Sequence, residues 1–155
     1  MEIMEWLPEM TVGNAAIDAA HQALFDQMQF LLSAQDTEIV IGFLALADRL
    51  ERDFREEETL MEGIEFAGLR PHREEHARVL SALHHVDTGD PLTAREVLQL
   101  MVQWFPLHVM TMDAALVAAL RRDVFPTTPL DGGSAPSPEE LRLLADTMPG
   151  EGPGD

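Results

Sequence analysis

The hydrophobic positions of this 155-residue chain recur with the spacing of an α-helix in four segments. In the first segment, Leu24, Phe25, Met28, Leu31 and Leu32 fall on one side of a helix. No segment shows the sustained alternation of apolar and polar residues, rich in β-branched and aromatic side chains, that marks a β-strand. The pattern therefore predicts an all-α protein.

Residues that favour helix ends place the boundaries of the four helices at about 18–33, 36–63, 71–86 and 93–122. The expected starts are an Asp18 cap, an Asp36 or Thr37 cap, Pro71 in the first helical position, and a capping box of Thr93 and Glu96. Because the connections are short, neighbouring helices should be antiparallel, which gives an up-down-up-down four-helix bundle.

Two helices carry further expectations. The apolar residues of the second helix include Ile41, Leu44, Leu50, Phe54 and Met61. The fourth helix contains Pro106, which lacks an N–H group and should kink it.

The composition changes at Pro126, because the last 30 residues hold six of the ten prolines and five of the ten glycines. We therefore expect a bundle over residues 1–125 and a flexible C-terminal tail over residues 126–155. Within the tail, Ser137-Pro138-Glu139-Glu140 is a good helix start and predicts a short helix near residues 138–147.

The charge and the missing cysteines narrow the range of functions. A formal net charge of −18 would repel nucleic acids and anionic membranes. No uninterrupted apolar run approaches the roughly 18 residues of a membrane span, and the acidic start does not resemble a secretory signal, so we expect a cytoplasmic protein. Because the chain has no cysteine, nitrogen and oxygen atoms must hold any metal.

Each predicted helix offers side chains that suit a metal, although each also has a simpler explanation. His72 and His76 are four residues apart and share a helix face, as a surface pair would by chance. His108 and Asp113 lie among apolar residues, where a hydrogen-bonded core histidine is common.

The other two helices offer Asp53 and Glu57, which belong to an acidic run typical of a solvated face, and His21, which simple exposure would also explain. Four independent coincidences that together reproduce one metal-binding pattern are improbable.

This combination resembles the hemerythrin family. The motifs are Ile17-Asp18-x-x-His21-Gln22-x-Leu24-Phe25, Phe54-x-x-Glu57-Glu58-x-x-Met61, His72-x-x-x-His76 and Trp104-Phe105-x-x-His108-Val109-x-x-x-Asp113. The resemblance extends from about Trp6 to Arg122 and leaves the tail unmatched.

The resemblance implies a pair of iron ions with an oxo or hydroxo bridge. His72, His76 and His108 would hold one iron, His21 would hold the other, and Glu57 and Asp113 would bridge them. The residues at the positions of the family's apolar oxygen pocket are Phe54, Trp104, Phe105 and Val109, although an ordinary bundle core demands the same residue types. Manganese accepts the same nitrogen and oxygen donors.

Asp53 departs from the family pattern, which has histidine on the second iron. It could bind that iron directly, bind through water, or leave the iron more open. Three hypotheses follow. The first is a protein that binds dioxygen or another small diatomic for storage, delivery or sensing, without catalytic residues. The second is a di-iron oxidase or peroxidase, and the third is a degenerate scaffold with one metal or none. The sequence identifies no protein partner.

Overall fold

The computed structural model describes residues 5–87 and 89–124, which belong to the first of two units of the chain, residues 1–125. Within these described ranges the elements are helical and no strand occurs, which confirms the all-α prediction. The tail and its expected helix lie outside the described residues, so those expectations stay predictions. The elements are η1 (Pro8–Met10), α1 (Ala15–Leu32), α2 (Asp36–Gly63), α3 (Leu69–His84), α4 (Pro91–His108), η2 (Val109–Asp113) and α5 (Ala114–Val124).

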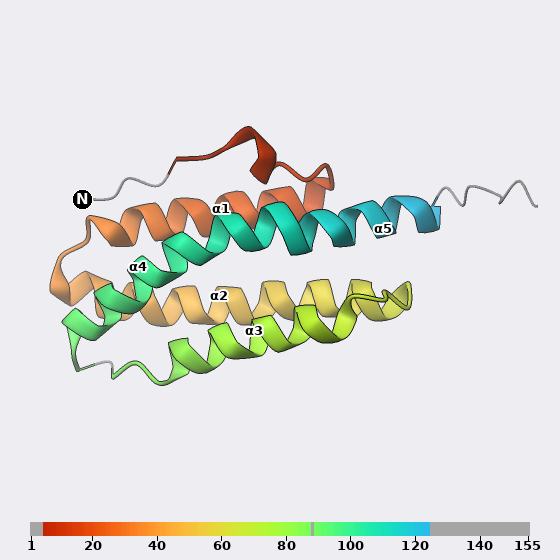
Figure 1. Ribbon diagram of the computed structural model, residues 1–155. Helices are drawn as coiled ribbons and strands as arrows, with labels where there is room; N and C mark the ends of the chain where they lie inside the picture. Colours follow the sequence, from red (N-terminus) through yellow and green to blue (C-terminus); the bar gives the residue numbers. More distant parts are fainter. Residues whose placement is uncertain (1–4, 88, 125–155) are drawn as a thin grey trace, which may run out of the picture. The chain divides into compact units, whose positions relative to one another are not determined.

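The elements α4, η2 and α5 follow one another without a break and form one long helical stretch. This stretch lies side by side with α1, α2 and α3 (Figure 1). α2 packs against α1, α3 and α4, and α1 also packs against α4. The inward stripe of α2 consists of Ile39, Phe43, Leu46, Ala47, Leu50, Phe54 and Met61. Ile41 and Leu44, which also mark the helix in the sequence, are exposed because they lie outside this stripe.

The first helix begins three residues earlier than Asp18, because Asn14 is its N-cap and accepts a hydrogen bond from Ile17 N. Asp18 instead lies in the first turn, where its carboxylate accepts hydrogen bonds from Val12 N and Gly13 N. It therefore ties the preceding loop to α1. This contact lies about one helical turn before His21.

The other helix starts also differ in detail from the prediction. α2 begins after Gln35, whose N–H donates to the Glu38 carboxylate. Pro71 is the third residue of α3, where an N–H would still lack a partner within the helix. Asp90, not Thr93, caps α4 by accepting a hydrogen bond from Leu92 N.

The stretch Pro91–Val124 is long and apolar enough to cross a membrane, by length and composition alone. This stretch was not predicted from the sequence, because its apolar residues are interrupted by polar ones. Its buried residues include His108 and Asp113, which pack inside the protein. A core helix of a folded domain meets the same criteria, so the stretch is weak evidence for a membrane.

Candidate metal centre

Six ionisable side chains from four helical stretches meet inside the helical unit. Within the described residues these six are the buried polar side chains, and each is at most 6% exposed. They are His21 of α1, Glu57 of α2, His72 and His76 of α3, His108 of α4 and Asp113 of η2. The sequence analysis named all six as candidate metal ligands. Because they are buried together, none of them is an exposed surface residue or an isolated core residue.

A π-helical turn brings His108 and Asp113 to the same side. Residues five apart in an α-helix point about 140° away from each other, because each residue turns the helix by about 100°. The turn η2 (Val109–Asp113) is wider, so His108 and Asp113 both reach the interior. The helix thus becomes irregular just after Pro106, and the irregularity is this π turn at Val109–Asp113.

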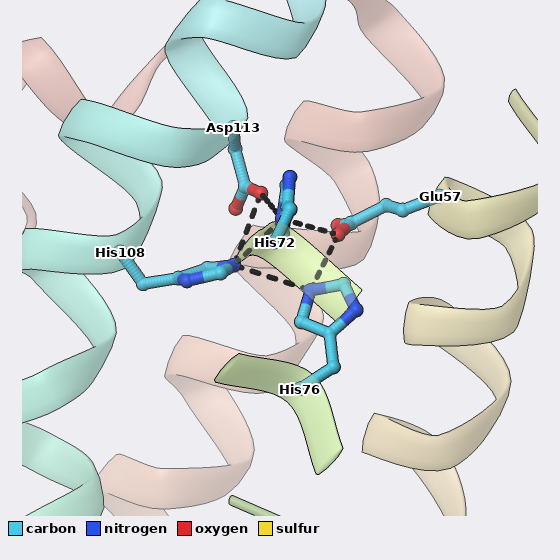
Figure 2. Close-up of side chains that lie close together, drawn as sticks. All are labelled: Glu57, His72, His76, His108 and Asp113. Carbon is cyan, nitrogen blue, oxygen red and sulfur yellow. Dashed lines mark hydrogen bonds and ion pairs between the residues drawn. The ribbon is translucent and has the colours of Figure 1, made fainter. Parts of the chain in front are cut away.

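Three imidazole nitrogens converge on one point (Figure 2). His108 Nε2 lies 3.1 Å from His72 Nε2 and 3.3 Å from His76 Nε2. Each neutral imidazole has one nitrogen that carries a proton and one that carries a lone pair. Three ring nitrogens at this separation are best satisfied by a cation between them, since nitrogen lone pairs facing one another repel.

The two carboxylates divide their oxygens between this triplet and His21. Glu57 Oε2 lies 3.3 Å from His76 Nε2, and Glu57 Oε1 lies 3.5 Å from His21 Nε2. Asp113 Oδ1 lies 3.0 Å from His72 Nε2 and 3.1 Å from His108 Nε2, whereas Asp113 Oδ2 lies 3.1 Å from His21 Nε2. Each carboxylate therefore spans two groups of imidazoles, as a bridge between two cations would.

Unsatisfied oxygens test whether metal fits this cluster. Glu57 Oε2 and Asp113 Oδ1 are buried beside ring nitrogens, yet neither accepts a hydrogen bond with acceptable geometry from the described residues. A buried carboxylate oxygen without a hydrogen bond is unfavourable unless a cation compensates it. Five of the residues, Glu57, His72, His76, His108 and Asp113, offer donor atoms within 4.8 Å of one another. The donor set therefore fits a metal ion with a preference for nitrogen and oxygen.

Proton equilibria in the metal-free cluster reflect its close charges. Burial alone lowers the pKa of His21, but interactions with Asp113 and Glu57 outweigh burial and raise this pKa to about 9. Burial opposes ionisation of Asp113, yet His108, His21 and His72 hold its pKa well below the usual range. Burial also lowers the pKa of His108, but interactions with Asp113, Glu75 and Glu57 together outweigh burial and raise it. Without metal, protonated His21 and His108 would therefore pair with the ionised carboxylate of Asp113.

Asp53 lies near the cluster but outside its network of contacts. It borders a cavity of about 60 Å³ together with Glu57 and with Ala16, Ile17 and Ala20 of α1. Its Oδ2 atom is buried and has no hydrogen-bond partner among the described residues. Burial raises the pKa of Asp53, although Arg49 opposes this rise. The carboxylate thus has an uncompensated oxygen on the α1 side of Glu57.

Aromatic rings surround the cluster, at three of the four positions predicted to form the oxygen pocket. Phe54 stacks on His76 with ring centroids 3.8 Å apart, and Trp104 stacks on His108 at 4.5 Å. Phe105 meets His21 edge-on at 5.8 Å. The fourth residue, Val109, is fully buried in the core. These side chains hold the imidazoles in place and shield them, and their contact with oxygen stays a prediction.

Two further acids contact the cluster, and the sequence reading had missed them. Glu75 accepts hydrogen bonds from Trp104 Nε1 and His108 Nδ1, and Glu58 accepts one from His76 Nδ1. The sequence analysis did not single out Glu75, and it named Glu58 only within the motif that contains Glu57. The Glu58–His76 and Glu75–His108 contacts each join residues at least 18 positions apart, so the spacing of nearby residues in the sequence does not reveal them.

A helical protein with buried histidine and carboxylate ligands from four helical stretches defines a metal-binding helical domain. The chain is 30% identical over 124 residues to a bacteriohemerythrin of Ralstonia nicotianae (strain ATCC BAA-1114 / GMI1000), an alignment that covers 77% of this chain and 90% of the relative. No family model matches the chain, and no solved structure matches it. On the alignment and the cluster together, the chain belongs to the hemerythrin family.

Proposed function

We propose that the protein holds two iron ions and binds dioxygen or another small diatomic for storage, delivery or sensing. The observation that carries this proposal is the division of the Glu57 and Asp113 oxygens between His21 and the three other histidines. A single cation would need only one of these groups. Two cations bridged by carboxylates use both, because the bridging charge offsets the mutual repulsion of the ions.

The ligands fall into two sets. His72, His76 and His108 would hold one iron, His21 would hold the second, and Glu57 and Asp113 would bridge them. Iron would supply the reversible electron transfer that dioxygen binding requires. The rings of Phe54, Trp104 and Phe105 would keep water from the site and slow the loss of a charged oxygen species. We also propose that a fold of four helices in up-down-up-down order, within residues 1–125, presents these ligands. The connections between α1, α2 and α3 are short, and each of these helices packs against the next one in the chain, which supports that order.

We propose that Asp53 completes the ligand set of the second iron. Its buried oxygen without a partner and the cavity that it shares with Glu57 support this assignment. Two ferrous ions and their carboxylate ligands carry a summed charge of +1 when Asp53 joins the two bridging carboxylates and +2 when it does not. The additional negative charge favours the ferric state, since it stabilises the more highly charged ions.

The same feature favours a second candidate function, a di-iron oxidase or peroxidase. A centre that readily becomes ferric transfers electrons to a bound oxygen species more easily than one that releases dioxygen unchanged. The orphaned oxygen of Asp53 is the specific observation behind this alternative.

Metal analysis and spectroscopy test the proposal. Protein produced with ample iron should contain about two irons per chain, and the reduced protein should change its visible spectrum on exposure to air. Return of the original spectrum after oxygen is removed would indicate reversible binding, whereas a permanent change would indicate oxidation. A reproducible content of one iron or none, or retention of zinc in preference to iron, would overturn the di-iron proposal.

A further inference from the structure

The four imidazoles of the cluster differ in what lies behind them. His108 Nδ1 is 3.1 Å from Glu75 Oε1, and His76 Nδ1 is 3.2 Å from Glu58 Oε1. The Nδ1 atoms of His21 and His72 are buried and have no hydrogen-bond partner among the described residues. Two imidazoles are therefore backed by carboxylates and two are not.

Glu75 accepts more than one hydrogen bond. The same Oε1 atom also accepts a hydrogen bond of 2.7 Å from Trp104 Nε1. Trp104 lies one helical turn before His108 and stacks on its ring, with the two ring planes 30° apart. One oxygen of α3 thus fixes two rings of α4 that are already in contact.

The carboxylate of Glu58 is more strongly neutralised than that of Glu75. Glu58 Oε2 lies 3.2 Å from Arg73 Nε, so a cation draws on its charge. Among the described residues, the arginine that pairs with Glu75 is Arg78, at 3.9 Å, and the side chain of Arg78 is 76% exposed. Solvent screens such an exposed pair. The negative charge of Glu75 is therefore less neutralised by arginine, and it acts more strongly on the two hydrogen-bond donors, Trp104 Nε1 and His108 Nδ1.

We propose that Glu75 is a positioning residue that sets the orientation and donor strength of His108 in the metal centre. This inference rests on the proposed function. A carboxylate on Nδ1–H fixes the tautomer in which the Nε2 lone pair faces the metal, and it makes the imidazole a stronger donor. A stronger donor stabilises the ferric state. Trp104 limits this effect, because it donates to the same oxygen and shares its charge.

Three variants test the proposal. Glu75→Gln removes the charge with little change in size, and Trp104→Phe removes the indole N–H but keeps an aromatic ring. Glu74→Gln is the matched control, because Glu74 is the exposed neighbour of Glu75 and pairs only with exposed Arg70 within the described contacts. Each protein is loaded with iron, its affinity is measured by competition with a chelator, and its reduction potential is determined.

The two variants of the network should move the reduction potential in opposite directions. Glu75→Gln should weaken iron binding by about 10- to 100-fold and raise the potential, because His108 becomes a weaker donor. Trp104→Phe should lower the potential, since Glu75 then serves His108 alone. Glu74→Gln should match the wild type. Equal behaviour of Glu75→Gln and Glu74→Gln, or shifts of the same sign in Glu75→Gln and Trp104→Phe, would overturn the proposal.

A measurement without metal separates this inference from the proposed function. At alkaline pH, where the imidazole is neutral, Glu75 Oε1 and Asp113 Oδ1 compete for the one ring proton of His108, because Asp113 Oδ1 lies 3.1 Å from Nε2. ¹⁵N NMR of the metal-free protein should therefore show a larger share of this proton on Nδ1 in wild type and in Glu74→Gln than in Glu75→Gln. If wild type takes up fewer than two irons, the di-iron proposal fails. Unchanged His108 signals in Glu75→Gln would instead contradict the role of Glu75.

Discussion

The two sides of the metal cluster are built differently. On one side, the Nε2 atoms of His72 and His76 lie within 3.3 Å of His108 Nε2, and carboxylates hold two of the three rings from behind. On the other side, His21 is the single imidazole, its Nδ1 has no hydrogen-bond partner in the described structure, and Asp53 borders a small cavity. The three-histidine side has more donors, whereas the His21 side has fewer. Under the di-iron proposal, one metal position would retain its ion and the other would accept an external ligand.

Removal of Glu57, which joins the two sides, should have the largest effect. Glu57→Ala should lose both metals, because its oxygens face His76 on one side and His21 on the other. The metal-free fold should also lose about 3–5 kcal/mol of stability, since His76 and His21 would each lose a buried carboxylate that faces them. Elemental analysis and urea unfolding measure the two effects.

Glu56→Ala is the control for this variant, because Glu56 is exposed on the same helix. Glu58→Ala is not a neutral comparison, since Glu58 contacts His76. Equal metal content in Glu57→Ala and Glu56→Ala would remove Glu57 from the bridge.

Loss of one histidine from each side should separate the two positions. His21→Ala should reduce the iron content from about two to about one per chain, because the three-histidine side keeps its donors. His108→Ala should lose more, since its Nε2 is the nitrogen that both His72 and His76 approach. The measurement is iron per chain after dialysis against a weak chelator. The same iron content in both variants would mean that the two sides do not act as separate positions.

Local spacing was enough to predict the helices and six candidate ligands, but not the contacts behind them. Pairs four residues apart, such as His72 and His76, share a helix face wherever the helix lies. The start of α1 was placed three residues late, because both Asn14 and Asp18 can cap a helix and the loop contacts of Asp18 decide between them. The π turn was not predicted, because the five-residue spacing of His108 and Asp113 does not by itself show that both side chains face the interior. The place of Glu75 depends on packing between α3 and α4.

The stability of the metal-free protein should fall as the pH rises from about 6.5 to about 9. The folded-state pKa of His21 is about 9, above its ordinary value, so its charged form binds Asp113 and Glu57 more strongly in the folded protein. This contribution, about 3 kcal/mol, is fully present below pH 6.5 and is lost as the pH passes through 9. Urea unfolding of metal-free protein at several pH values measures it.

Metal-loaded protein is the comparison for this prediction, because a metal-bound imidazole is already neutral and its metal-bound nitrogen carries no proton. Its stability should change little over the same range of pH. A metal-free protein that is equally stable at pH 6.5 and pH 9.5 would show that His21 is not held by the carboxylates in the way the structure describes.

The smallest expected effect concerns Asp53, on the side with fewer donors. Asp53→His replaces an anionic donor with a neutral one, raises the charge of the ferrous centre by one, and should slow autoxidation without a change in iron content. Stability must be followed as well, because imidazole is larger than carboxylate and the cavity at this position is only about 60 Å³. Stopped-flow spectroscopy of the reduced proteins mixed with oxygen, with Asp53→Asn as the neutral control of similar size, follows formation and decay of the oxygen adduct. If wild type already forms a stable, reversible adduct and Asp53→His matches it, the carboxylate does not tune the second iron, and the oxidase or peroxidase alternative loses its main support.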